Sequence, residues 1–113
     1  MEQHYKLARV KELADNDMDF VKSLAEAFLE EVPVDAERLK KAVEEQDYFN
    51  AYQAAHKMKP TVDLFELGVL QDLIVVQDWG KFEKHGEDCS KELELVLTAV
   101  ENATAELKED FNL

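Results

Sequence analysis

The residues from Ala51 to Phe65 carry the pattern that most constrains how this chain can fold. Their apolar members recur at spacings of three and four, which at about 100° per residue gathers them on one face of a helix. A stripe of this kind is typical of a helix whose one face is buried. It consists of Ala51, Ala54, Ala55, Met58, Val62 and Phe65.

One histidine in this stretch lies away from the stripe. By the same rotation His56 falls about 160° from Met58, so we expect its side chain to face water. Lys59 follows three residues later and shares the outer face of the helix. A lone histidine on a helix is most often an ordinary surface residue. A solvent-facing imidazole with a cation beside it is nevertheless a candidate site, because packing alone does not require it.

The other periodic segments also predict helices, with Asn16 or Asp17 as the cap of the second and Asp47 as the cap of the helix that carries His56. Pro33 indicates a break or a new first turn, and Pro60 predicts a kink. Residues 80–86 are expected to form a loop. The expected helices span about 5–13, 17–32, 35–45, 47–67, 70–79 and 87–110. Helices of this length joined by short loops predict an all-α fold, an antiparallel four-helix bundle with a short additional N-terminal helix.

Composition limits the class of protein. A chain of 113 residues, 46% of them hydrophobic, is long enough for one packed domain, which we place at residues 1–113. With only three Gly and two Pro, it has few of the turns that an all-β fold needs. Its net charge of -13 repels phosphate backbones, so we expect no nucleic-acid partner.

The same composition bears on location and on cysteine chemistry. We see no apolar signal segment at the N-terminus and no run near the roughly 18 apolar residues that a membrane span requires. We therefore expect a cytoplasmic protein that does not enter the membrane, and a monomer. Cys89 is the only cysteine, so no intramolecular disulfide and no thiolate metal cluster can form.

The residues around His56 resemble the histidine-containing phosphotransfer (HPt) domain of multistep phosphorelays. The core pattern of that family is His-x-Leu-Lys-Gly-Ser, and this chain has His56-Lys57-Met58-Lys59-Pro60-Thr61. The resemblance extends from about residue 5 to residue 107 and includes Asp19-Phe20, Phe28-Leu29-Glu30 and Asp47 before Tyr48-Phe49. Two positions depart from the family, because Pro60 and Glu66 stand where it usually has glycine.

The resemblance implies a function. His56 would accept a phosphoryl group from an aspartate of a receiver domain and pass it to another receiver, and Lys59 would offset the charge of the transferred group. The partners would be the receiver domains of a hybrid sensor kinase and of a response regulator. We expect no cofactor and no metal on this chain, because the divalent metal would belong to the receiver. No Gly-rich phosphate loop is present, so we expect no ATP-dependent kinase activity.

A docking surface is predicted around His56 from the residues that share its side of the helix. Exposed aromatic side chains next to a reactive residue suit such a surface. Asp63 is expected to orient water or Lys59, and Lys57 to assist from the flank. For Phe49 and Tyr52, packing on a neighbouring element is the alternative. The predicted partner-binding residues are Phe49, Tyr52, Gln53, Lys57, Pro60 and Asp63.

The sequence offers less support for several other functions. Di-iron bundles need Glu-x-x-His pairs, but the residues three before His4, His56 and His85 are Met1, Gln53 and Phe82. A zinc site is not supported either, because the three histidines and the one cysteine are scattered and show no ligand spacing. An acidic carrier protein would need an exposed serine for a prosthetic arm, but Ser90 follows Asp88-Cys89 and lacks the Asp-Ser-Leu context of such carriers. The serious alternative is an adaptor of the same fold that binds receiver-like or other signalling partners without transferring phosphate.

Overall fold

The computed structural model describes residues 3–113, and every regular element in that range is a helix. This confirms the all-α prediction. None of these helices combines the length and apolar character needed to cross a bilayer. The helices are α1 (Ala8–Leu13), α2 (Met18–Glu44), α3 (Tyr48–Leu64), α4 (Leu70–Lys81) and α5 (Ser90–Phe111).

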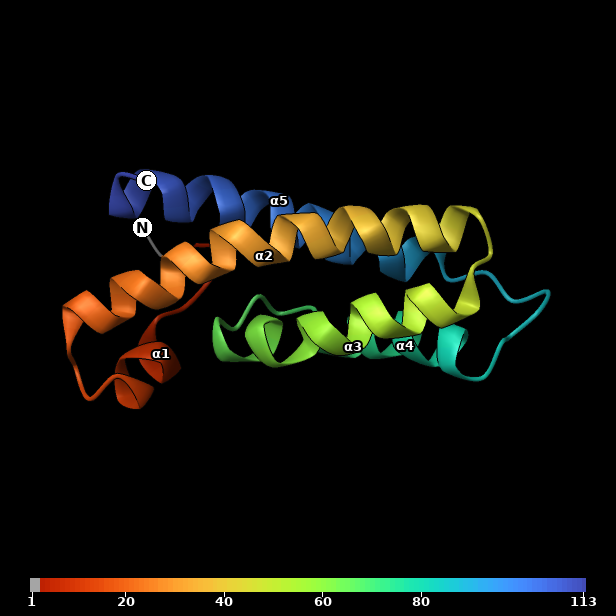
Figure 1. The fold of residues 1–113 in the computed structure, drawn as a ribbon, viewed down its shortest axis with the longest axis horizontal. Coiled ribbons are helices and arrows are strands. Elements are labelled where there is room, and N and C mark those ends of the chain that lie inside the picture. The colour runs from red at the N-terminus through yellow and green to blue at the C-terminus, as the bar shows by residue number, and fades with distance from the viewer. Residues whose placement is uncertain (1–2) are drawn as a thin grey trace.

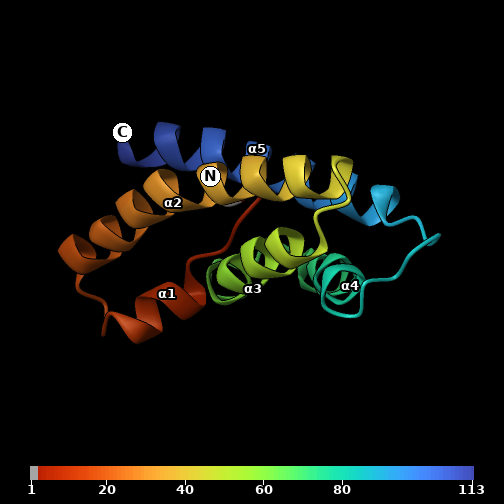
Figure 2. The same cartoon turned by 45° about the vertical axis from the view of Figure 1, so that its right-hand side comes forward.

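The four longer helices run along the long axis of the molecule in two pairs (Figures 1 and 2). Helix α2 lies beside α5, and α3 lies beside α4; α3 also contacts α2, and α5 also contacts α4. The extents of 46 × 22 × 20 Å correspond to a body about two helices thick, since a helix with its side chains is about 10 Å wide. Helix α1 packs against α2 and reaches α3 only near its end, through Arg9 and Asp63, so His56 stays exposed.

The predicted stripe on α3 forms the centre of the core. All six of its residues are buried, which confirms the core helix and its orientation. The ring of Phe65 at the end of this stripe packs on Phe28 of α2, with 5.0 Å between ring centroids. Because one face of α3 is fixed against α2 and α4, its opposite face is held toward solvent.

Both predicted aspartate caps are present. The carboxylate of Asp17 accepts hydrogen bonds from the backbone N–H groups of Asp19 and Phe20, which begins α2. The carboxylate of Asp47 accepts from the backbone N–H of Asn50 at 3.1 Å, which begins α3. Hydrogen bonds from the side chain and backbone of Asn50 hold the pKa of Asp47 below its ordinary value. Such caps satisfy N–H groups that lack a partner in the first turn.

Pro33 does not break α2, so the expected separation into two helices was wrong. The helix is continuous from Met18 to Glu44, and residues on both sides of the proline are buried, including Val32 and Ala36. Burial on both sides outweighs the single backbone hydrogen bond that proline removes. Helix α3 likewise continues through Pro60 to Leu64, and the kink expected there stays a prediction.

Several predicted boundaries were also wrong. Residues 5–7 precede α1 as a non-helical segment, in which the Lys6 N–H donates to the carbonyl of Phe65 at 2.8 Å. Helix α3 ends three residues before Leu67, because the chain turns through Glu66 with φ of 50°. Gly80 belongs to α4 and not to the loop. Helix α5 begins at Ser90 rather than near residue 87.

Candidate functional site

His56 projects from the solvent side of α3. Its side chain is exposed, whereas Ala55 before it and Met58 after it are buried, which confirms the orientation expected from helical rotation. The imidazole stacks on the ring of Tyr52 one turn earlier, with 5.5 Å between centroids and 23° between the ring planes. Tyr52 therefore lies along one side of the imidazole, while the His56 side chain stays exposed to solvent.

Lys59 lies one turn after His56 on the same side of α3 and is half-buried. Within residues 3–113, no carboxylate lies within ion-pair distance of its ammonium group. This leaves the cation available to an anion that approaches or is formed at the imidazole.

Lys57 is directed away from the imidazole toward α2. Its Nζ lies 3.3 Å from Oδ1 of Asp35, a buried carboxylate. Adjacent helical residues do not face each other, and this ion pair draws Lys57 further toward α2. The arrangement gives Lys57 a structural partner and leaves Lys59 as the cation nearer to His56 along its face of the helix. Sequence reasoning missed Asp35, whose burial depends on how α2 packs against α3.

Loss of the Lys57 ammonium should destabilise the fold. Lys57→Met leaves the buried carboxylate of Asp35 without its cation, and we expect the free energy of unfolding to fall by about 1–2 kcal/mol, less than for a fully buried pair because Lys57 is half-exposed. The measurement is urea unfolding at neutral pH. The double variant Asp35→Asn with Lys57→Met should recover most of the loss. Equal stability of the wild type and Lys57→Met would contradict the assignment.

Asp63 is bound by Arg9 of α1. The Nη1 of Arg9 lies 2.9 Å from Oδ1 of Asp63, and Nη2 lies 3.3 Å from Oδ2. Nη1 also donates to the backbone carbonyl of Asp63 at 3.0 Å. Hydrogen bonding to Asp63 raises the pKa of Arg9 above its ordinary value. This carboxylate ties α1 to the end of α3. Its expected role in orienting water or Lys59 stays a prediction.

The remaining predicted partner-binding residues differ in exposure. Phe49 is 69% exposed, so the alternative in which it packs on a neighbouring element was wrong. Pro60 is exposed, and Gln53 and Tyr52 are half-buried. The solvent face of α3 thus presents an aromatic ring, the imidazole and a proline within three turns.

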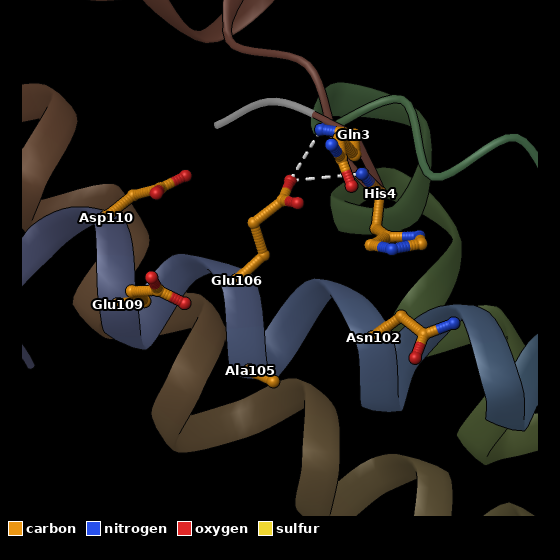
Figure 3. Close-up of a pocket in the computed structure, with 7 residues that line it drawn as sticks. All are labelled: Gln3, His4, Asn102, Ala105, Glu106, Glu109 and Asp110. Carbon is orange, nitrogen blue, oxygen red and sulfur yellow. Dashed lines mark hydrogen bonds between the residues drawn. The ribbon is translucent and has the colours of Figure 1, made fainter.

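The other two histidines have different surroundings. His85 lies in the segment between α4 and α5, where its Nδ1 is 3.1 Å from the hydroxyl oxygen of Tyr48. His4 lies in the N-terminal segment over α5, beside Asn102 (Figure 3). The backbone N–H of His4 donates to Oε1 of Glu106 at 3.0 Å, and that of Gln3 donates to the same oxygen at 2.7 Å. These contacts hold chain segments in place. Both histidines lie outside the helices of residues 3–113, unlike His56 and Lys59, which lie one turn apart on α3.

Two further chemical possibilities receive no support. Burial raises the pKa of the Cys89 thiol to about 11, so this cysteine is a poor nucleophile at neutral pH. No group of three or more His, Cys, Asp or Glu side chains within residues 3–113 is arranged to hold a metal ion.

His56 is thus an exposed imidazole on a helix anchored by its opposite face and bordered by Tyr52 on one side. Lys59 lies one turn along and has no ion-pair partner among residues 3–113. This arrangement can present a nucleophilic nitrogen to a group carried by a second molecule. No protein-family model, no curated protein and no solved structure matches the chain.

Proposed function

We propose that this chain is a histidine phosphotransfer protein, which carries a phosphoryl group on His56 between the aspartates of receiver domains. The observation that carries the proposal is the exposure of His56 on a helix whose other face is entirely buried. The HPt-like motif His56–Thr61 adds to it. The finer architecture is part of the proposal: α2 to α5 form an antiparallel four-helix bundle, to which α1 is an addition. The successive reversals of chain direction in Figure 1 support this.

The proposed chemistry is a reversible transfer between two side chains. A nitrogen lone pair of the neutral imidazole attacks the phosphorus of an aspartyl phosphate, a P–N bond forms, and the P–O bond to the aspartate breaks. The aspartate leaves as a carboxylate, and the imidazole returns to the neutral state by losing its remaining proton to solvent. Attack by the aspartate of a second receiver reverses these steps and frees His56.

Phosphoryl transfer depends mainly on positioning and on stabilising negative charge. Helix α3 supplies the position, because its buried stripe fixes the orientation of His56. Lys59 supplies a positive charge beside the transferred group. The divalent metal that assists the reaction belongs, in this proposal, to the receiver. The chain acts in the cytoplasm as a monomer and takes its phosphoryl group from a hybrid sensor kinase.

An adaptor that binds without transfer is the alternative function. The exposure of Phe49 next to the His56 face favours a docking surface under either function. The transfer function and the adaptor function are distinguished by measuring phosphotransfer from each receiver domain of the source organism, labelled with acetyl phosphate. At least one receiver should pass its label to the wild type within seconds to minutes. If the chain binds receivers but accepts label from none, the adaptor function is correct.

Removing the charge of Lys59 should slow the transfer. Losing one charge-assisted contact of about 1.4 kcal/mol in the transition state lowers the rate about tenfold, so we expect this reduction for Lys59→Ala. Lys59→Arg, which keeps the charge, should retain most of the rate. Stability should change by less than about 0.5 kcal/mol, because the ammonium group has no ion-pair partner in the described part of the chain. The measurement is the initial rate of label transfer from a phosphorylated receiver, and an unchanged rate for Lys59→Ala would refute this role.

A further inference from the structure

A hollow lies on the side of His56 that faces α4. It is formed by the first turns of α3 and the last turn of α4, has a volume of about 450 Å³ and is lined by Phe49, Tyr52, Gly80, Lys81 and Glu83. Phe82 follows α4 between two of these lining residues, and its ring lies 5.4 Å from the Nζ of Lys81. Phe49 and Phe82 are 69% and 61% exposed, more than any other aromatic side chain in residues 3–113.

The hollow has a fixed base, because α3 and α4 touch backbone to backbone beneath it. A Cβ atom added to Gly80 would lie 2.6 Å from the carbonyl oxygen of Tyr48 and 2.7 Å from the backbone nitrogen of Tyr52. The glycine thus allows the close approach of the two backbones at the base of the hollow. A surface set by backbone contact needs little ordering when a partner binds.

The segment that borders the hollow after α4 is also held in place. The ring of Trp79 packs on that of Tyr48 with 4.6 Å between centroids, and its Nε1 donates to the carbonyl of Glu87 at 2.9 Å. On its other side Tyr48 contacts His85, with a ring-centroid distance of 4.6 Å. Residues 82–89 are therefore tied to both α3 and α4, which fixes the region that carries Phe82.

The hollow is continuous with the candidate site through Tyr52, which lines the hollow and stacks on His56. Phe49 and His56 are seven residues apart on α3, about 10 Å along the helix axis. A typical protein interface covers about 800 Å² on each partner, a patch about 30 Å across. A protein centred on His56 therefore covers the hollow as well.

We infer that this hollow is the apolar anchor of the docking surface, and that the receiver domain which exchanges phosphate with His56 fills it with an apolar side chain. This inference rests on the proposed function. The arrangement matches that of binding hot spots, in which exposed aromatic groups surround a preformed pocket and charged residues form the rim. The hollow is lined by Lys81 as well as Glu83, and Lys59 lies beside His56. These two lysines are cations on a chain of net charge -13, and they suit a partner whose phosphoryl site is an aspartate.

The inference predicts that docking and chemistry can be separated by mutation. Phe49→Ala combined with Phe82→Ala should lower the second-order rate of transfer from a phosphorylated receiver about tenfold or more. The rate at saturating receiver should be retained, because His56 and Lys59 are unchanged. Labelling by phosphoramidate, a small donor that needs no docking surface, should match that of the wild type. Phe20→Ala, which removes an exposed ring from the distant start of α2, is the matched control and should leave all rates unchanged.

Each outcome of this experiment decides between the possibilities. If receiver transfer to the double variant equals that to the wild type, the docking inference is wrong while the proposed function stands. If phosphoramidate labelling falls together with receiver transfer, the phenylalanines act on His56 itself, and the docking inference is again overturned. If no receiver labels the wild-type chain, the proposed function fails and the inference fails with it.

Discussion

Replacing His56 with glutamine should abolish phosphoryl acceptance from every donor and leave the fold intact. The glutamine amide nitrogen has no lone pair available for attack on phosphorus, because that pair is delocalised into the carbonyl. The side chain at this position is exposed and the stacking on Tyr52 is a surface contact, so we expect stability to change by less than about 0.5 kcal/mol. The measurements are label incorporation from a phosphorylated receiver and a thermal unfolding curve.

His85→Gln is the matched control for this substitution. It removes an imidazole that contacts Tyr48 and lies in the non-helical segment between α4 and α5, and it should keep full label incorporation. His56→Gln should also retain binding to the receiver, since the aromatic part of the surface is untouched. Residual label in His56→Gln would mean that another nucleophile accepts the phosphoryl group.

Replacing Gly80 with valine should cause the largest loss of stability of any change considered for this chain. Both atoms that a Cβ at this position would meet within 3 Å belong to the backbone of α3 and cannot rotate away. Helices α3 and α4 must then separate, and valine adds two methyl groups at the point of contact. We expect the free energy of unfolding to fall by about 3 kcal/mol, the upper part of the range for overpacked cores. The measurement is urea unfolding at neutral pH.

Gly86→Ala is the control for the Gly80 substitution. Gly86 has φ of 81° but no heavy atom within 4 Å of an added Cβ, so alanine there meets only backbone strain, about 1–2 kcal/mol. Gly80→Ala should lower the free energy of unfolding by less than Gly80→Val does, because a gain of about 1 kcal/mol in helix propensity offsets part of the clash. An unfolding midpoint for Gly80→Val equal to that of the wild type would contradict the close approach of the two helices.

The helices and the face of α3 that is buried could be predicted from sequence, because both follow from local rules. The period of the helix fixes the angle between His56 and Met58 whatever the rest of the chain does. The caps at Asp17 and Asp47 follow equally from chemistry within three residues. The continuity of α2 through Pro33 does not, because it depends on the burial of residues on both sides against other helices.

The part of the site that could not be predicted consists of contacts between distant residues. Arg9 is 54 positions from Asp63, and Asp35 is 22 positions from Lys57, so no local pattern pairs them. Helical rotation alone places Lys57 and Lys59 on the two flanks of His56. Only the buried carboxylate of Asp35 on α2 shows that Lys57 is the lysine held in an ion pair. The sequence predicts that Gly80 begins a loop, whereas in the structure it lies in α4 and lets this helix approach α3.

Locating the phosphoryl group on the chain tests the central claim most directly. The wild-type protein would be incubated with a phosphorylated receiver and then studied by phosphorus NMR and by mass spectrometry of its peptides. We predict a single P–N linkage, labile in acid and stable in base, on the peptide that contains His56. A phosphoryl group on any other residue, or none from any receiver that binds the chain, would contradict this account.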